Sequence, residues 1–120
     1  MKELSMGELE SRFADIIWEN EPIRSGELSK RAEELLNWKK TTSFTILRRL
    51  CDKGIFRNEN GVVTSVMSND EFRALRTEQF VDGTFGGSLP AFIAAFTSRK
   101  SLSKEELTEL RRMIDAHSEV

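Results

Sequence analysis

The chain has 120 residues, which is enough for one compact domain or for a small domain with an appendage. Charged residues make up 32% and hydrophobic residues 38%, a balance typical of a folded protein rather than of a disordered or membrane-spanning one. The polar, acidic start MKELSMGELE is unlike a signal peptide, and no apolar run approaches the roughly 20 residues that cross a bilayer. We therefore expect a cytoplasmic location and no direct membrane binding.

The sequence contains one cysteine, Cys51, and one histidine, His117, which limits its chemistry. These residues cannot form an intramolecular disulfide or one of the usual zinc ligand sets. The glycines near Gly83 lack the preceding strand and the spacing of a nucleotide-binding loop. We expect Cys51 to be a small buried apolar side chain. The sequence thus predicts no catalytic site, no metal and no cofactor, and the chain is not expected to be an enzyme.

Two amphipathic helices are predicted at the start of the chain, over residues 6–20 and 25–36. A capping box of Ser5 and Glu8 is expected to begin the first, and Glu21-Pro22 to end it. Its apolar face recurs with helical spacing at Met6, Leu9, Phe13, Ile16 and Ile17. The buried stripe expected of the second helix is formed by Leu28, Ala32 and Leu35.

A third helix is predicted over residues 40–53, and Gly54 is a natural residue to end it. Its apolar side consists of Ile46, Leu47, Leu50 and Cys51. Its opposite side consists of Thr41, Thr42, Thr45, Arg48 and Arg49. Short hydroxyl side chains allow close approach to DNA, and arginines reach phosphates or guanine edges. This helix is therefore suited to the major groove.

The distribution of charge agrees with that interpretation, although the net charge of the chain is −2. Residues 37–57 contain six cations and only one anion, Asp52, a local charge of +5. The cations are Lys39, Lys40, Arg48, Arg49, Lys53 and Arg57. For a nucleic-acid-binding protein, such a local cluster matters more than the total charge.

A β-hairpin is predicted next, with strands at residues 55–58 and 62–66. The turn Glu59-Asn60-Gly61 contains Asn-Gly, the strongest short hairpin signal. Three helices followed by a hairpin are typical of a winged helix-turn-helix, in which the hairpin is the wing. Phe44, on the outward side of the third helix, either packs against this wing or touches DNA. The predicted fold class is mostly α with a small β-hairpin wing, and the DNA-binding domain covers residues 1–68.

Residues 69–120 are predicted to form a helical dimerisation region. Helix starts are expected at a capping box beginning with Ser68, at Ser88, and at a capping box beginning with Ser103, and the stretch from Gly83 to Gly87 is expected to break the first of these helices. The apolar residues of this region are Phe72, Leu75, Leu89, Phe92, Ile93, Phe96, Leu107, Leu110 and Ile114. Short amphipathic helices cannot bury this much apolar surface alone, so we expect these residues to form a homodimer interface. The alternative is that the helices fold back onto the winged domain.

The order of these features resembles the penicillinase-repressor family of transcription regulators over nearly the whole chain. The residues that carry the resemblance are Ile16-Ile17-Trp18, Trp38, Thr41 to Leu50, Lys53-Gly54, Phe85 to Leu89, and Phe92-Ile93. The resemblance implies a symmetric homodimer bound to an inverted-repeat operator in double-stranded DNA. It also implies control of β-lactam resistance, with a membrane-bound sensor protease whose response to a β-lactam ends repression by cutting the repressor.

Two features of that family, its cleavage site and its copper-binding cysteines, can be compared with this sequence. The family is cut at an Asn-Phe bond, and the matching position is Ala95-Phe96, where the phenylalanine is kept and the asparagine is not. A branch of the family that responds to copper uses paired cysteines near the C-terminus. This chain has no cysteine after Cys51, which excludes that branch.

The sequence therefore predicts a DNA-binding repressor with assigned contacts. The residues expected to face bases are Thr41, Thr42, Thr45 and Arg48. Phosphates are expected to be contacted by Lys39, Lys40 and Arg49. In the wing, Arg57 and Asn60 are expected to contact the DNA backbone. Two alternatives remain. One is a protein-interaction module, favoured by the overall acidic charge. The other is a ligand-sensing regulator with a pocket between the phenylalanine-rich C-terminal helices.

Overall fold

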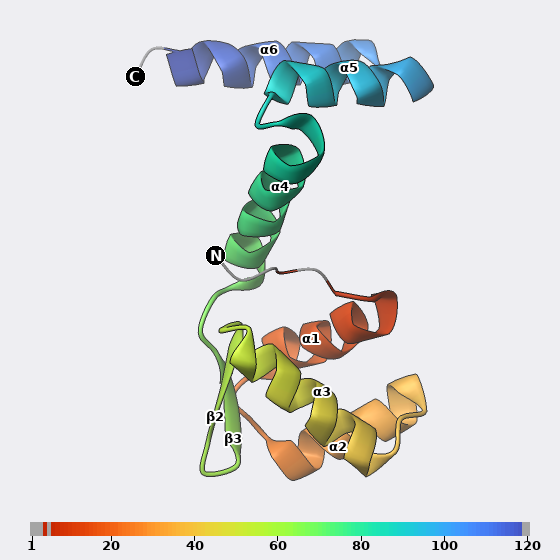
Figure 1. Cartoon of the computed structure of the whole chain (residues 1–120), viewed down its shortest axis with the longest axis vertical. Coiled ribbons are helices and arrows are strands. Elements are labelled where there is room, and N and C mark those ends of the chain that lie inside the picture. The colour runs from red at the N-terminus through yellow and green to blue at the C-terminus, as the bar shows by residue number, and fades with distance from the viewer. Residues whose placement is uncertain (1–3, 5, 119–120) are drawn as a thin grey trace. The chain divides into compact units, whose positions relative to one another are not determined.

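The computed structural model describes residues 4 and 6–118, which divide into two compact units, Met1–Gln79 and Phe80–Val120. Its described elements are, in order, α1 (Glu8–Asn20), β1 (Ile23–Arg24), α2 (Ser25–Leu36), α3 (Lys40–Asp52), β2 (Phe56–Glu59), β3 (Val62–Ser65), α4 (Asn69–Phe85), α5 (Leu89–Arg99) and α6 (Lys104–Ser118) (Figure 1). The predicted fold class, mostly helical with a small antiparallel sheet, is confirmed. The compact units divide inside α4, whereas the functional division after residue 68 stays a prediction.

Helix α1 begins later than predicted. Its N-cap is Gly7, which makes no side-chain cap hydrogen bond, so the helix begins at Glu8 rather than at residue 6. The proposed capping residue Ser5 lies outside the described residues. Leu9, in the first turn, is exposed, and Ala14 is buried instead. Met6, which precedes the helix, is buried, so the predicted face reaches the core at every position except Leu9.

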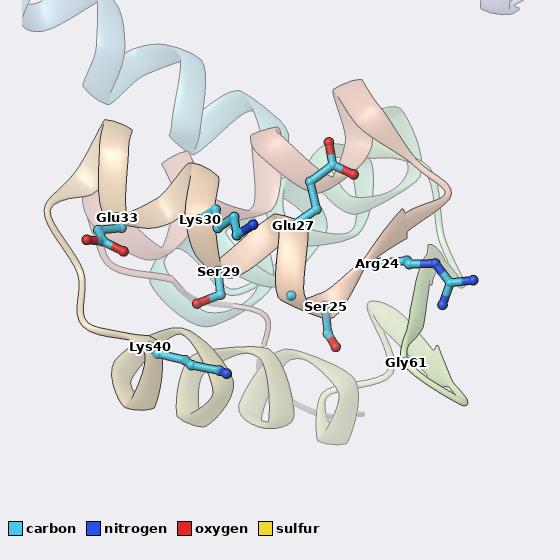
Figure 2. A pocket seen from close by; sticks show the side chains of 9 residues that line it. Arg24, Ser25, Glu27, Ser29, Lys30, Glu33, Lys40 and Gly61 are labelled. Carbon is cyan, nitrogen blue, oxygen red and sulfur yellow. The ribbon is translucent and has the colours of Figure 1, made fainter.

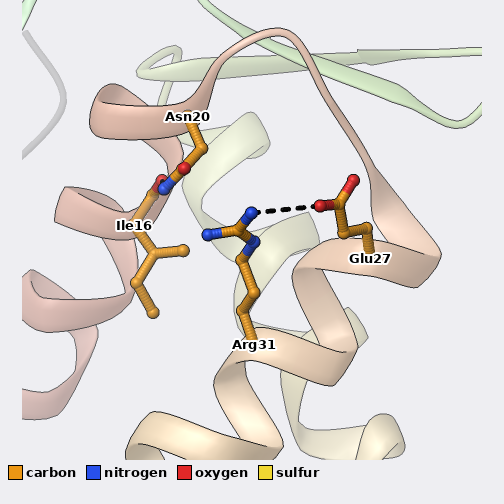
Figure 3. A network of polar contacts seen from close by, with 4 residues as sticks. All are labelled: Ile16, Asn20, Glu27 and Arg31. Carbon is orange, nitrogen blue, oxygen red and sulfur yellow. Dashed lines mark hydrogen bonds and ion pairs between the residues drawn. The ribbon is translucent and has the colours of Figure 1, made fainter.

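Helix α2 has the predicted bounds, but its buried face is different. Leu35 was expected to be buried and is 56% exposed, whereas Ser29 is 6% exposed. The buried positions are thus Leu28, Ser29 and Ala32, in the first two turns. On the exposed side, Arg31 forms an ion pair with Glu27 at 3.1 Å, close to the end of α1 (Figure 3). A serine at an inward position is invisible to a pattern of apolar residues, which explains the error.

The core of the first unit is closed around aromatic side chains. Phe13 packs on Trp38 with ring centroids 5.1 Å apart, and Trp18 packs on Phe56 at 5.0 Å and on Phe72 at 5.5 Å. The indole N–H of Trp18 donates to the carbonyl of Met67 at 3.0 Å. These contacts join α1 to β2 and to the start of α4.

The sheet contains a strand that the sequence did not predict. β1 pairs with β3, which gives the antiparallel order β1-β3-β2. The turn between β2 and β3 has Asn60 at φ 53° and Gly61 at φ 82°, as expected of Asn-Gly in a hairpin. The carboxylate of Glu21 accepts hydrogen bonds from the N–H and hydroxyl of Ser65, at 2.9 and 2.8 Å. The wing is thereby attached to the end of α1.

Helix α4 ends within the stretch from Gly83 to Gly87 that was predicted to break it, although it continues through Gly83 itself. It ends at Phe85, because Gly86 and Gly87 adopt left-handed backbone conformations with φ 58° and 82°. A single glycine inside a helix costs only about 1 kcal/mol, so Gly83 alone does not stop it. At the other end, the Ser68 hydroxyl accepts the N–H of Glu71 at 3.0 Å, as predicted.

The second unit has well-capped helices but little buried surface. The Ser88 hydroxyl accepts the N–H of Ala91 at 3.1 Å. The predicted capping box of α6 is complete: Glu106 N–H donates to the Ser103 hydroxyl, and Ser103 N–H donates to the Glu106 carboxylate, both at 3.0 Å. No residue in the described parts of α5 and α6 is buried. No helix in the described part of the chain is long and apolar enough to cross a membrane.

Candidate nucleic-acid interface

The two sides of α3 differ as the sequence predicted. Its buried residues are Ser43, Ile46, Leu47 and Leu50. The exposed positions include Thr41, Thr42, Phe44, Thr45, Arg48 and Arg49. The buried side chains pack into the core of the first unit, so the polar side is presented outward in a fixed orientation.

The hydroxyl of Thr45 is already used within α3. It donates to the carbonyl of Thr41 at 2.9 Å. With its proton engaged, the Thr45 oxygen can act toward a base only as an acceptor. Suitable donors in the major groove are the amino groups of adenine and cytosine.

The start of α3 is positively charged and partly apolar. Lys39 is the N-cap, and Lys40 is the first helical residue. The Lys40 ammonium lies 5.7 Å from the centroid of the Phe44 ring, a cation–π arrangement. Phe44 thus contributes to the exposed surface by orienting Lys40.

A counter-ion that sequence analysis missed lies at the other end of α3. The guanidinium of Arg49 contacts the carboxylate of Glu10, on α1, at 2.8 Å. The two residues are 39 positions apart, so no local pattern links them. Arg49 can contact a phosphate only by exchanging this partner or sharing it.

The wing presents a second charged pair. The Nε of Arg57 lies 3.4 Å from a carboxylate oxygen of Glu59 on the same strand, and both side chains are exposed. Asn60 occupies the turn at the tip of the hairpin. A pair this exposed is weak and can exchange readily with a phosphate.

A cleft of about 620 Å³ lies between the starts of α2 and α3 and the wing turn (Figure 2). Its lining residues are Arg24, Ser25, Gly26, Glu27, Ser29, Lys30, Glu33, Lys40 and Gly61. Of these residues, sequence analysis assigned only Lys40 to the site. The others escaped because β1 is two residues long and because Ser25, Gly26 and Ser29 have no distinctive pattern.

Comparison with known proteins assigns the family. The model of the penicillinase repressor family matches residues 6–116. The chain belongs to the penicillinase-repressor family. Among similar curated proteins, the penicillinase repressor of Bacillus licheniformis is 25% identical over 119 residues, covering 96% of this chain and 91% of the relative. The methicillin resistance regulatory protein MecI of Staphylococcus aureus (strain N315) is 21% identical over 117 residues, covering 94% of each chain.

The residues predicted for the dimer interface of this penicillinase-repressor family member divide between the two units. Phe72 was predicted to lie at the interface but is only 4% exposed, packed in the core of the first unit, and Leu75 packs against the same core. Because Phe72 is already buried within one chain, we correct that assignment. In the second unit the partly or fully exposed candidates are Leu89, Phe92, Ile93, Phe96, Leu107, Leu110 and Ile114.

The predicted cleavage position of this family member, Ala95-Phe96, lies inside α5. The carbonyl of Ala95 accepts from the Ser98 hydroxyl at 2.7 Å, and that of Phe96 accepts from the N–H of Lys100 at 3.1 Å. Both side chains are exposed in the single chain, so the bond is held in helical structure but is not buried.

Cys51 is half-buried against the core rather than fully buried. Burial, and secondarily the negative charge of Asp52, raises the pKa of its thiol, although a backbone hydrogen bond from Asn58 opposes the shift. The protonated thiol is a poor nucleophile. Within residues 4 and 6–118, no three His, Cys, Asp or Glu side chains are placed to hold a metal ion.

Proposed function

We propose that this chain is a sequence-specific transcriptional repressor that binds operator DNA through α3 and the wing. The observation that carries the proposal is the exposed face of α3, where threonines and Arg48 lie opposite a buried apolar side. An α-helix with this arrangement fits the major groove and offers hydrogen-bonding groups to base edges. Membership of a family described as penicillinase repressors supports the same function.

The proposed contacts follow from where each side chain lies. Base edges are contacted by Thr41, Thr42, Thr45 and Arg48. Phosphates are contacted by Lys39, Lys40 and Arg49. The DNA backbone beside the wing is contacted by Arg57 and Asn60. Phosphate contacts fix the position of the protein, whereas base contacts provide sequence discrimination. Substitutions in the two groups should therefore have different effects.

The test compares three variants on a cognate promoter and on random duplex. Arg48→Ala is expected to weaken operator binding by about 1–3 kcal/mol, with a smaller effect on random DNA. Lys40→Ala should weaken both equally and flatten the salt dependence by about one ion. Arg12→Ala, which removes an exposed arginine from α1, is the matched control and should bind as wild type does. If Arg48→Ala also binds like wild type, α3 is not the recognition helix.

We propose that the protein acts as a homodimer on an inverted repeat, assembled through the second unit. The support is the exposed apolar surface of that unit, where Leu89 is 59% and Ile114 is 64% exposed. Two linked winged units gain affinity for two half-sites through their effective concentration. Sedimentation should show a dimer at micromolar concentration, and a monomer would contradict this proposal.

We further propose that the operators belong to β-lactam resistance genes and that proteolysis ends repression. The relatives are named for penicillinase and for methicillin resistance, and a repressor of such genes would act in the cytoplasm. A membrane-bound sensor protease would cut near Ala95-Phe96 after local opening of α5. Mass spectrometry of the protein from β-lactam-treated cells should show two fragments. An intact chain beside a derepressed gene would exclude this mechanism.

A further inference from the structure

An aromatic side chain lies in the middle of the polar face of α3. Thr41, Phe44, Thr45 and Arg48 follow the spacing i, i+3, i+4 and i+7, which places them on one face of a helix. All four are exposed, whereas the opposite face of α3 is buried. Phe44 therefore lies between Thr41, one turn before it, and Arg48, one turn after it, which are both assigned to base contacts.

Packing within the chain leaves much of the Phe44 ring uncovered. The residue is 37% exposed and is not a member of the core cluster of the described residues. The Lys40 ammonium lies 5.7 Å from the centroid of its ring. A cation over one face of a ring leaves the other face and the edge free to meet an apolar group. Single exposed apolar side chains are common on protein surfaces, so it is the position of Phe44 among the base-contacting residues that indicates a role.

The chemistry of the major groove limits what such a ring can meet. Adenine, guanine and cytosine present hydrogen-bonding groups there, and a ring that covers these groups removes them from water without replacing their hydrogen bonds. Thymine is the exception, because it also presents its apolar C5-methyl group. With α3 in the groove, the Phe44 ring is therefore best accommodated opposite a thymine.

We propose that Phe44 recognises one thymine in each operator half-site by contacting its C5-methyl group. This inference rests on the proposed function, because it requires α3 to lie in the major groove. The contact differs in kind from those of the flanking residues: the Thr45 oxygen can accept from the amino group of adenine or cytosine, and Arg48 can donate to guanine. Phe44 thus adds a base preference that the hydrogen-bonding residues of α3 do not provide.

The test removes a single methyl group from the DNA. An operator is first selected from random duplexes with the wild-type protein. Each thymine in it is then replaced in turn by uracil, which pairs as thymine does but lacks the methyl group. One such replacement in each half-site should lower wild-type affinity about fourfold, the effect expected for losing one buried methyl group. Phe44→Ala should bind the thymine and uracil duplexes equally at that position.

Two further variants separate the methyl contact from the cation–π contact. Phe44→Leu loses the ring that Lys40 lies over but keeps an apolar side chain, so it should still prefer thymine by about twofold or more. Leu35→Ala is the matched control, since it removes an exposed apolar side chain from α2, and it should show the full wild-type preference. A change in how Lys40 meets a phosphate alters affinity for both duplexes equally and leaves their ratio unchanged. Circular dichroism should show the same helix content in all three variants, because neither residue belongs to the core.

The outcomes separate this inference from the proposed function. If the wild-type protein binds no duplex and selects no sequence, the proposed function is wrong, and the thymine assignment with it. If Arg48→Ala weakens binding to the selected operator but no uracil replacement weakens wild-type binding, only the assignment of Phe44 is wrong. The same conclusion follows if every loss caused by uracil persists in Phe44→Ala, because another side chain then contacts the methyl group and the Phe44 ring serves the wing or a protein partner.

Discussion

The two compact units of this chain are stabilised in different ways. In the first, side chains from helices and strands close a core in which Phe13, Ile17 and Leu50 have no exposed surface. In the second, no described residue of α5 or α6 is buried, and Phe80 is half exposed although its ring lies 5.9 Å from Phe85 and 6.2 Å from Phe92. The first unit thus has what it needs to fold alone. The second unit has formed helices, but their apolar faces can be buried only against another surface.

Local interactions explain why the second unit is nevertheless helical. Ser88 and Ser103 cap the starts of α5 and α6, whereas α1, α2 and α3 have no side-chain cap and depend on tertiary packing. Caps contribute about 1 kcal/mol each, too little to hold short helices in isolation. Association must therefore supply most of the stability of the second unit.

The largest effect should come from separating the units. A fragment of residues 1–79 should fold cooperatively as a monomer, whereas a fragment of residues 80–120 should lose most of its helix when diluted. The cut must follow Gln79, because a cut after Asn69 would remove Phe72 from the core. Circular dichroism and sedimentation of both fragments test this. A stably helical, monomeric 80–120 fragment would contradict the comparison.

A matched pair of phenylalanine substitutions should show the same contrast within the intact chain. Phe13→Ala should lower the free energy of unfolding by about 3–5 kcal/mol at every protein concentration, because it leaves a cavity beside Trp38. Phe96, by comparison, is 46% exposed in the single chain. Phe96→Ala should act mainly on association, so its effect on urea unfolding should depend on protein concentration. Equal, concentration-independent losses would show that Phe96 belongs to a monomer core.

The fold was predicted well where local chemistry decides it. The bounds of α2, the Asn60-Gly61 turn and the capping boxes beginning at Ser68 and Ser103 all depend on residues close together in the chain. Tertiary packing decides the rest. β1 is too short to show a period and exists because β3 provides a partner. Phe72 belongs to the apolar residues predicted for the dimer interface, but its ring packs on that of Trp18, a contact between two helices that no local pattern indicates.

The same division applies to the candidate site. The exposed face of α3 could be predicted because the buried and polar positions alternate with the helical period. The Glu10–Arg49 pair could not, because it joins two helices. The cleft is lined in part by Ser25, Gly26 and Ser29 of α2, which lie there because of their position in the fold and not because of their residue type. A search for cations therefore finds Lys40 and misses what surrounds it.

A smaller effect is expected at the start of α6, where local interactions matter most. Ser103→Ala should destabilise the first turn by about 1 kcal/mol and speed amide exchange there roughly fivefold. Ser101→Ala, an exposed serine outside the helix, is the control. Unchanged exchange in Ser103→Ala would show that packing of α6, rather than its cap, holds the first turn.

This capping box should also depend on pH. Hydrogen bonds from the backbone N–H and then the hydroxyl of Ser103 lower the pKa of Glu106. A carboxyl with a lowered pKa in the folded state stabilises that state above its ordinary pKa of about 4.3. The contribution is lost as pH falls through the folded-state value. Wild type should exchange more slowly than Glu106→Gln at pH 7, and the difference should vanish at low pH.

The smallest effect should come from a partly exposed ion pair in the first unit, where the core dominates stability. Glu10→Gln breaks the contact with Arg49 and should lower the free energy of unfolding by no more than about 1 kcal/mol. It should also raise affinity for any duplex by up to about fivefold, because Arg49 no longer has to leave a carboxylate in order to meet a phosphate. Glu19→Gln removes the same charge from an exposed position of α1 without breaking this pair, so it measures the effect of net charge alone. Binding isotherms at two salt concentrations compare the variants. If Glu10→Gln weakens DNA binding, the carboxylate serves to orient Arg49 toward the DNA, and the pair supports recognition instead of competing with it.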